Sequence, residues 1–291
     1  MSKKLWIIFA AIGGTLFLSL AVTFFFFDLN ISIALATDNL QNPNLFLKTC
    51  AAIGEFPIYI GPLLFGLVYG RTNKTKLWQL IANFVGFLVV YIASIRLIEG
   101  IFEEFFSSEL GLTQQVLLAI SSLLVYVLFF LLFQKFDVNN LEKLRDVSLI
   151  MLIVSVASFA GVQVVKHVMG RARFRALDEN YSEFTNFLTI REFLGGLNGD
   201  NYKSFPSGHT ASAACLLTTT LIPLKLSNKK WLAPLTLAIT FAYTFMIALS
   251  RVCIGAHYAS DVLFGFGCTT ICYIVCYIVF IKKGWLNVRS N

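Results

Sequence analysis

Long apolar runs constrain this 291-residue chain more than any other feature of its sequence. A helix that crosses a bilayer needs about 20 mostly apolar residues, and it must satisfy its backbone polar groups internally. Only 13% of the residues are charged, whereas a typical soluble domain has about 25%. The sequence therefore predicts an all-α, polytopic membrane helix bundle with about eight transmembrane helices. The expected spans are Leu5–Phe27, Ala51–Gly70, Leu77–Ile98, Gln114–Phe133, Val147–Val165, Thr210–Leu226, Trp231–Ser250 and Val262–Ile281.

The distribution of Lys and Arg predicts the orientation of the bundle. With the N-terminus in the cytoplasm, most basic residues outside a cluster near residue 170 fall in inner segments. The outer segment 99–113 holds no Lys or Arg and contains several glutamates. Because cytoplasmic loops carry an excess of Lys and Arg, we expect both termini in the cytoplasm. The net charge of +7 follows from this bias and from the basic cluster, so we expect no nucleic-acid binding.

The chain is expected to form one membrane domain, residues 1–291, with motif-bearing residues in its second half. Residues 1–146 are interpreted as additional and scaffold spans, and residues 147–282 as the catalytic core. Pro57 and Pro62 are expected to kink the second span. Glu55 and Arg96, near the outer ends of two spans, are expected to pair structurally or to extend to the interface.

A short polar motif, Phe-Pro-Ser-Gly-His-Thr at residues 205–210, precedes the sixth expected span. Pro206 suits the first turn of a helix, and Ser207 can cap that turn. The free N–H groups of a helix start bind anions, and His209 would stand beside such an anion. A histidine exchanges protons near neutral pH. Pro-Ser-Gly is also ordinary turn chemistry, so this motif alone does not decide the function.

Two further groups of polar residues follow the fifth and seventh expected spans. Lys166 and Arg173 are separated by six residues, and both side chains suit phosphate oxygens. A basic run beside a membrane also anchors lipid headgroups, which is the alternative for this segment. After the seventh span, Arg251 precedes His257, and Asp261 lies four residues further on the same helical face. Asp261 can accept the Nδ1 proton of His257 and leave Nε2 free to attack.

The expected topology brings these groups to one side of the membrane. The chain has three histidines, His167, His209 and His257, and all three lie at outer ends of spans. The long outer loop contains apolar residues at near-helical intervals, which indicate either a short interfacial helix or a loop packed on the bundle. These residues are Phe184, Phe187, Leu188, Phe193 and Leu194.

Together the three blocks resemble the signature of the type-2 phosphatidic acid phosphatase family. That signature reads Lys, six residues, Arg-Pro; then Pro-Ser-Gly-His; then Ser-Arg, five residues, His, three residues, Asp. The second and third blocks match fully, at residues 206–209 and 250–261. The first block departs at Phe174, where the family has proline. This change affects the backbone of the loop more than phosphate binding.

The resemblance implies a role for each matching residue. His257 would attack phosphorus and form a phosphohistidine, with Asp261 holding its ring. His209 would protonate the leaving oxygen and then activate water. The phosphate would be bound by Lys166, Arg173, Ser207, Gly208 and Arg251.

The resemblance also implies a membrane lipid phosphatase that needs no metal or other cofactor. The substrate would carry a terminal phosphate or diphosphate on a lipid, such as phosphatidic acid, phosphatidylglycerol phosphate, undecaprenyl diphosphate or lipid A phosphate. We expect a bacterial plasma membrane, an extracytoplasmic site, and no obligate protein partner. A lipid phosphotransferase is the alternative, which a second phosphate-binding site would distinguish. A transporter is a further alternative, which predicts charges near the middle of the bilayer.

Overall fold

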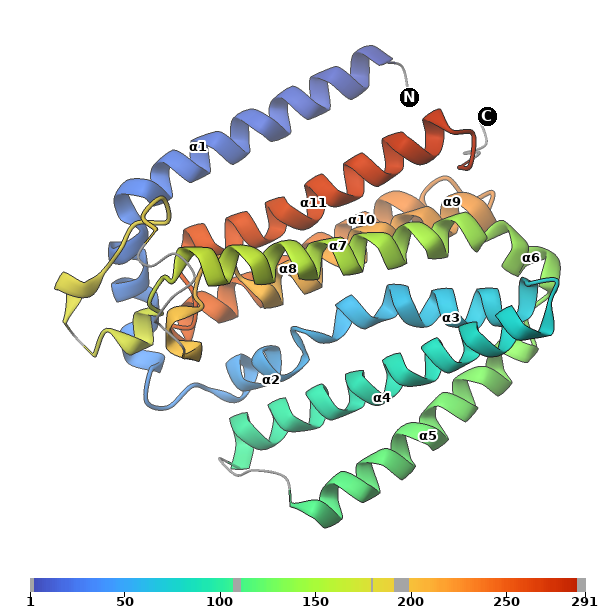
Figure 1. Ribbon diagram of the computed structural model, residues 1–291. Helices are drawn as coiled ribbons and strands as arrows, with labels where there is room; N and C mark the ends of the chain where they lie inside the picture. The colour runs from blue at the N-terminus through green and yellow to red at the C-terminus, as the bar shows by residue number, and fades with distance from the viewer. Residues whose placement is uncertain (1–2, 107–110, 179, 191–198, 287–291) are drawn as a thin grey trace.

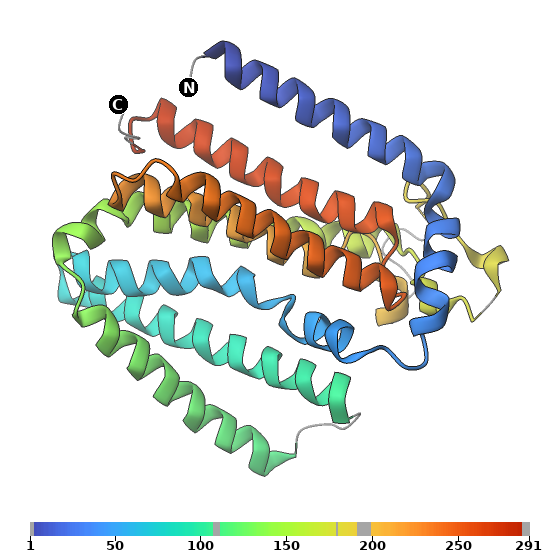
Figure 2. The same cartoon turned by 180° about the vertical axis from the view of Figure 1, so that it is seen from behind.

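The structure, a computed structural model, describes residues 3–106, 111–178, 180–190 and 199–286. Within these ranges the regular elements are all helical, and the long helices lie side by side in one bundle (Figures 1 and 2). The all-α, polytopic prediction is confirmed. The α-helices are α1 (Lys3–Ala36), α2 (Leu45–Ile53), α3 (Ile60–Thr72), α4 (Lys76–Phe106), α5 (Leu112–Gln134), α6 (Val138–Lys143), α7 (Arg145–Met169), α8 (Gly208–Ala214), α9 (Leu221–Leu226), α10 (Leu232–Cys253) and α11 (Ala259–Lys282).

Seven segments of the described chain are long and apolar enough to cross a membrane, so this is a multi-pass membrane protein. They are Ala11–Asn39, Leu45–Thr72, Lys76–Phe102, Leu112–Gln134, Arg145–Ala176, Leu232–Cys253 and Ala259–Lys282. The sixth expected span is not among them. There the chain runs through α8, a 3₁₀ segment Cys215–Thr220 and α9. The start of α1 and the end of α11 lie at the same end of the bundle (Figure 1), and an eighth crossing through this run stays a prediction.

The 3₁₀ segment between α8 and α9 has a local cause. The hydroxyl groups of Thr218, Thr219 and Thr220 each donate to the carbonyl three residues earlier, at 2.6 Å. Serine and threonine side chains that bond back to the helix backbone compete with the regular α-helical pattern. The run is mostly buried and packs against α7, α10 and α11. It is therefore the central element of the motif-bearing half.

The second expected span is broken rather than kinked. It consists of α2, a 3₁₀ turn Phe56–Tyr59 and α3. Pro57 explains the break, because a proline ring clashes with the carbonyl four residues earlier and provides no N–H to bond it. That carbonyl belongs to Ile53, the last residue of α2. Pro62 lies in the first turn of α3, where proline is tolerated, so the two expected kinks are replaced by one break at Pro57.

The remaining helices surround α7 and α8. Helix α7 packs against α3 and α11, α4 packs on α3, and α5 lies outside α4 (Figure 1). Most apolar side chains of α5 are exposed, for example Leu112 at 78% and Leu124 at 64%, as expected for a surface that faces lipid. An apolar core around Val147, Ile150 and Val154 of α7 fills the bundle at the end where α6 lies.

The loop between α7 and α8 packs on the bundle at the opposite end. Its described part contains 3₁₀ turns at Phe174–Ala176, Tyr181–Glu183 and Asp200–Tyr202. Residues 184–190 form no α-helix, and Phe187 is buried against Phe205 and Phe264. This supports the packed-loop alternative. Phe193 and Leu194, part of the expected interfacial helix, lie outside the described residues.

The predicted orientation can be tested with two exposed asparagines at opposite ends of the bundle. In a variant without reactive native cysteines, Asn180→Cys should react with a membrane-impermeant thiol reagent in intact cells, and Asn228→Cys should not. Both positions are exposed in the structure, so burial does not explain a difference between them. The reverse labelling pattern would place His209 and His257 in the cytoplasm.

Candidate active site

The three motif blocks meet at the loop-bearing end of the bundle. Lys166 lies in the last turn of α7, and Arg251 lies in the last turn of α10. His209 lies in the first turn of α8, and Asp261 in the first turn of α11. Helix α7 ends because Gly170 adopts a left-handed conformation with φ of 56°, which glycine adopts without steric cost. The chain then turns toward α8.

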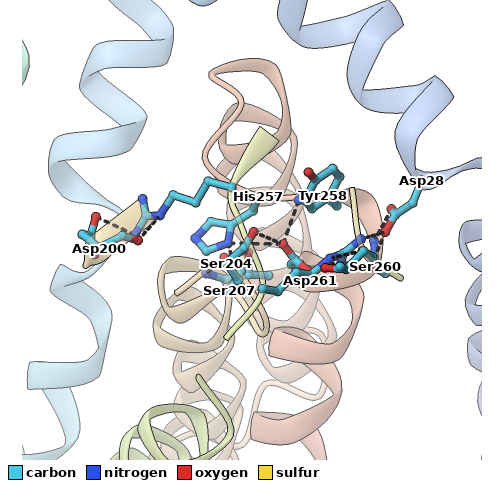
Figure 3. A network of polar contacts seen from close by, with 12 residues as sticks. Asp28, Asp200, Ser204, Ser207, His257, Tyr258, Ser260 and Asp261 are labelled. Carbon is cyan, nitrogen blue, oxygen red and sulfur yellow. Dashed lines mark hydrogen bonds and ion pairs between the residues drawn. The ribbon is translucent and has the colours of Figure 1, made fainter. Parts of the chain in front are cut away.

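His257 is completely buried at the centre of this site (Figure 3). Its Nδ1 lies 2.6 Å from the backbone carbonyl oxygen of Ser204, which can only accept a hydrogen bond. The proton is therefore on Nδ1, and Nε2 carries the lone pair. Nε2 has no hydrogen-bond partner among the described residues. This is the arrangement that a nitrogen nucleophile requires.

Asp261 does not hold His257 in the way that we expected. Its Oδ2 is 3.6 Å from Nδ1 of His257, which is too long for a hydrogen bond. Oδ2 instead accepts from the Ser204 hydroxyl at 2.5 Å and from the backbone N–H of Tyr258 at 2.9 Å. The expected direct bond is replaced by an indirect one, because Asp261 fixes Ser204 and Ser204 binds the imidazole. Its negative charge still lies beside the ring.

Sequence reasoning missed a buried ion triad behind His257. The Arg171 guanidinium donates to Asp261 Oδ1 at 2.5 Å and to Asp28 Oδ2 at 2.8 Å. All three side chains are at most 1% exposed. Asp28 comes from α1 and also accepts from the backbone N–H of Ser260 at 2.9 Å (Figure 3). A carboxylate at the end of the apolar run Leu5–Phe27 was the available signal, because intramembrane charges have partners.

Three cationic side chains act on His257. Arg173 is 6% exposed and Arg251 is 4% exposed, and Lys166 Nζ lies beside Gly208. Arg173 is oriented by Asp200, whose backbone carbonyl accepts from Nε at 2.9 Å and whose carboxylate accepts from Nη2 at 2.8 Å. Burial lowers the pKa of His257 well below its usual value, and the charges of these three side chains lower it further. His257 is therefore neutral near pH 7.

The Pro-Ser-Gly-His motif forms the start of α8. Ser207 is the N-cap, and its hydroxyl accepts from the Thr210 side chain at 3.0 Å and from the Thr210 N–H at 3.4 Å. The expected capping role of Ser207 is confirmed. We expected Pro206 in the first turn of the helix. It instead precedes the N-cap, because α8 begins only at Gly208, and the Phe205–Pro206 peptide bond is cis. The Ser207 N–H donates to the Asp261 carbonyl at 2.9 Å, which joins α8 to α11.

His209 lies on the α2 side of the site. Its Nε2 is 3.1 Å from the Ala51 carbonyl oxygen, and its Nδ1 is 3.3 Å from Oε1 of Glu55. Burial lowers the pKa of His209, and the charge of Arg251 lowers it further. Glu55 thus contacts a motif histidine, whereas Arg96 pairs with Glu99 at 3.4 Å on the surface of α4. The third histidine, His167, is exposed and bonded to the Gln163 carbonyl, so it lies outside the site.

Comparison with known families agrees with this geometry. The family model of the PAP2 superfamily matches residues 144–285. This part of the chain belongs to the PAP2 superfamily. Members of that superfamily are phosphatases, which indicates activity on phosphate esters. Comparisons with curated proteins and with solved structures gave no match. Asp28 and Glu55 precede the matched PAP2 region, although both contact its motif residues or their partners.

Phe174, where the PAP2 signature has proline, takes a structural role. Its side chain is 3% exposed, stacks on Tyr181 with ring centroids 5.9 Å apart, and contacts Tyr258 edge-on. The backbone around it is fixed on both sides, since Arg173 N–H donates to the Asn201 carbonyl and Arg175 N–H to the Gly255 carbonyl. Packing and these bonds supply the rigidity that a proline would give.

The ion triad predicts a large difference between two neighbouring arginines. Arg171→Leu leaves Asp28 and Asp261 buried without their cation, which should destabilise the fold by about 3–5 kcal/mol. Arg175→Leu is the matched control, because Arg175 is 40% exposed and lies 3.9 Å from Asp200. Its loss should cost less than about 1 kcal/mol. Thermal unfolding in detergent micelles would measure both, and equal midpoints would contradict the importance of the triad.

Proposed function

We propose that this protein is an integral membrane lipid phosphatase that removes a terminal phosphate through a phosphohistidine. The observation that carries the proposal is the geometry of His257. Its Nδ1 proton is bound by the Ser204 carbonyl, and its unpartnered Nε2 lies within the electrostatic influence of Lys166, Arg173 and Arg251. A neutral nitrogen beside three cations suits attack on an anionic phosphoryl group.

The reaction proceeds in two displacements at phosphorus. In the first, Nε2 of His257 forms a bond to phosphorus while the ester P–O bond breaks, and His209 gives a proton to the leaving oxygen. In the second, His209 takes a proton from water, whose oxygen attacks phosphorus and releases inorganic phosphate. The Ser204 carbonyl keeps its bond to Nδ1–H throughout. It therefore stabilises the positive charge that develops on the imidazole ring.

Fixed cations supply the electrostatic stabilisation in this mechanism. Lys166 contributes a compact charge, and Arg173 and Arg251 contribute planar guanidinium groups suited to phosphate oxygens. Asp200 accepts from Nε and Nη2 of Arg173. These two contacts hold the orientation of the guanidinium group. The Gly208 backbone lies against Lys166 at the start of α8, where N–H groups bind anions. The mechanism therefore requires no divalent metal.

The position of the site supports an amphiphilic substrate. The cationic residues lie at the ends of the long apolar helices α7 and α10, so a phosphate there is at membrane-interface depth. Phosphatidic acid, phosphatidylglycerol phosphate, undecaprenyl diphosphate and lipid A phosphate all fit this requirement. We place the site on the extracytoplasmic side of a bacterial plasma membrane. A phosphotransferase with the same residues is the alternative, in which a lipid hydroxyl replaces water in the second displacement.

The nucleophile assignment predicts a complete loss of turnover in His257→Ala. The purified variant should release no inorganic phosphate from any lipid of a panel containing the four candidates. Rapid quenching of the wild type should trap an acid-labile, base-stable phosphoenzyme that the variant lacks. His167→Ala is the matched control, because His167 is exposed and outside the site. Near wild-type phosphate release by His257→Ala would refute the assignment.

The electrostatic role of the three cations predicts independence from metal ions. Excess chelator should leave the rate of phosphate release unchanged. Vanadate should inhibit, because its trigonal bipyramidal form resembles the transition state of phosphoryl transfer. A loss of activity with chelator that magnesium restores would contradict this part of the mechanism.

A further inference from the structure

The break in the second span lies directly against the catalytic half of the chain. The end of a helix leaves carbonyl groups without partners inside the helix. Here, carbonyls around the end of α2 accept from side chains of α8 and α10. The Ala51 carbonyl faces His209 Nε2 at 3.1 Å, the Glu55 carbonyl accepts from Ser212 at 2.7 Å, and the Ile53 carbonyl accepts from Tyr243 at 3.2 Å. The first of these contacts involves a catalytic residue.

The Ala51 carbonyl determines the tautomer of His209. A carbonyl oxygen can only accept, so Nε2 carries a hydrogen, and Nδ1 is left to exchange a proton with the substrate. Gly54 allows this placement, because a Cβ at that position would lie 2.7 Å from Cδ2 of the His209 ring. The ring is thus held against the C-terminal end of α2 by one hydrogen bond and by a close approach that only glycine permits.

Nδ1 of His209 faces a carboxylate. Oε1 of Glu55 lies 3.3 Å from it, and the Glu55 side chain is 50% exposed, whereas that of His209 is 16% exposed. Nδ1 therefore faces a half-exposed carboxylate. When His209 is protonated, both ring nitrogens are donors, and each has an acceptor. The carbonyl end of a helix also stabilises a positive charge, which adds to the effect of Glu55.

The other titratable groups that face His209 do not favour its protonation. They are the cations Lys166 from α7 and Arg251 from α10, and the neutral imidazole of His257 from the loop before α11. His209 must nevertheless be protonated to act as an acid toward the leaving oxygen. Glu55, at the start of the 3₁₀ turn after α2, is the carboxylate in contact with His209 among the described residues. It opposes the repulsion from the two basic side chains.

We propose that Glu55, together with the carbonyl end of α2, is a positioning device that holds the proton His209 delivers to the leaving group. The inference rests on the proposed phosphatase mechanism. In the first displacement, the proton moves from Nδ1 to the ester oxygen as the P–O bond breaks and the bond from His257 to phosphorus forms. Glu55 makes no bond to phosphorus and remains a carboxylate throughout. The additional N-terminal half thereby contributes to catalysis.

The test compares two substrates that differ in their need for a proton. Phosphatidic acid loses an alkoxide-like oxygen that must be protonated, whereas p-nitrophenyl phosphate loses a phenolate that leaves without a proton. In Glu55→Gln, kcat/KM for phosphatidic acid should fall roughly tenfold, a part of the 10²–10⁴ that acid–base catalysis contributes. For p-nitrophenyl phosphate it should change by less than about twofold. We compare kcat/KM because it reports only the steps up to and including departure of the leaving group, when phosphorylation of the enzyme is irreversible.

The pH profile gives a second readout that a structural role would not change. Without Glu55, the protonated form of His209 is less stable, so the pKa of His209 falls. Because the acid must be protonated, the basic limb of kcat/KM for phosphatidic acid should move to lower pH in Glu55→Gln. Glu99→Gln is the matched control, since Glu99 is partly exposed, lies on α4, and pairs with Arg96. It should leave the substrate ratio and the pH profile unchanged.

The outcomes separate this inference from the proposed function. An equal loss with both substrates would indicate that Glu55 only supports the fold, and an unchanged kcat/KM would indicate no role; either result overturns the inference while the phosphatase stands. A wild-type protein that hydrolyses neither p-nitrophenyl phosphate nor any of the four candidate lipids would overturn the proposed function and the inference with it. A selective loss with phosphatidic acid, accompanied by the shifted basic limb, would support both.

Discussion

The burial of Arg171 between two carboxylates is the interaction on which the geometry of the site depends. An isolated charge in a low-dielectric interior costs several kcal/mol, so each member of the triad requires the others. Asp28 lies on α1, Asp261 lies at the start of α11, and Arg171 lies in the segment after α7, so the triad joins these three parts of the chain. Once Asp261 is fixed, the Ser204 hydroxyl is fixed by it, and the Ser204 carbonyl then orients His257. The nucleophile is thus positioned through a chain of short polar contacts.

The contacts across the molecule change the interpretation of its first half. Residues 1–146 were expected to be scaffold, and the PAP2 match begins only at residue 144. Asp28 nevertheless completes the ion triad, and the end of α2 binds the ring of His209. One of these contacts supports the residues around His257, and the other supports His209. The PAP2 region of this protein therefore depends on residues that lie outside it.

Sequence patterns predicted the features that depend on local composition. The bilayer imposes long apolar helices, and these were recognised in seven of the eight expected places. The expected span 210–226 is instead two short helices joined by a 3₁₀ segment, where Ser, Thr and Ala dilute the apolar character of the run. Spacing also identified the motif residues that meet at one end of the bundle, Lys166, Arg173, His209, Arg251, His257 and Asp261. The predicted hydrogen-bond partner of His257 was wrong. The acceptor is the backbone carbonyl of Ser204, and its position depends on the path of the loop that precedes it. Asp28 was missed because its pairing joins residues 143 positions apart, which no local pattern encodes.

The broken second span also has a consequence for biogenesis. The carbonyls of Ala51, Ile53 and Glu55 find their side-chain partners 158, 190 and 157 residues later in the chain. During synthesis, α2 and α3 leave the ribosome long before α8 and α10, and an unsatisfied carbonyl in lipid costs several kcal/mol. The break must therefore remain in the hydrated headgroup layer, or in the insertion machinery, until the later helices arrive. The second span therefore reaches its final position late in assembly, when the catalytic helices α8 and α10 are inserted.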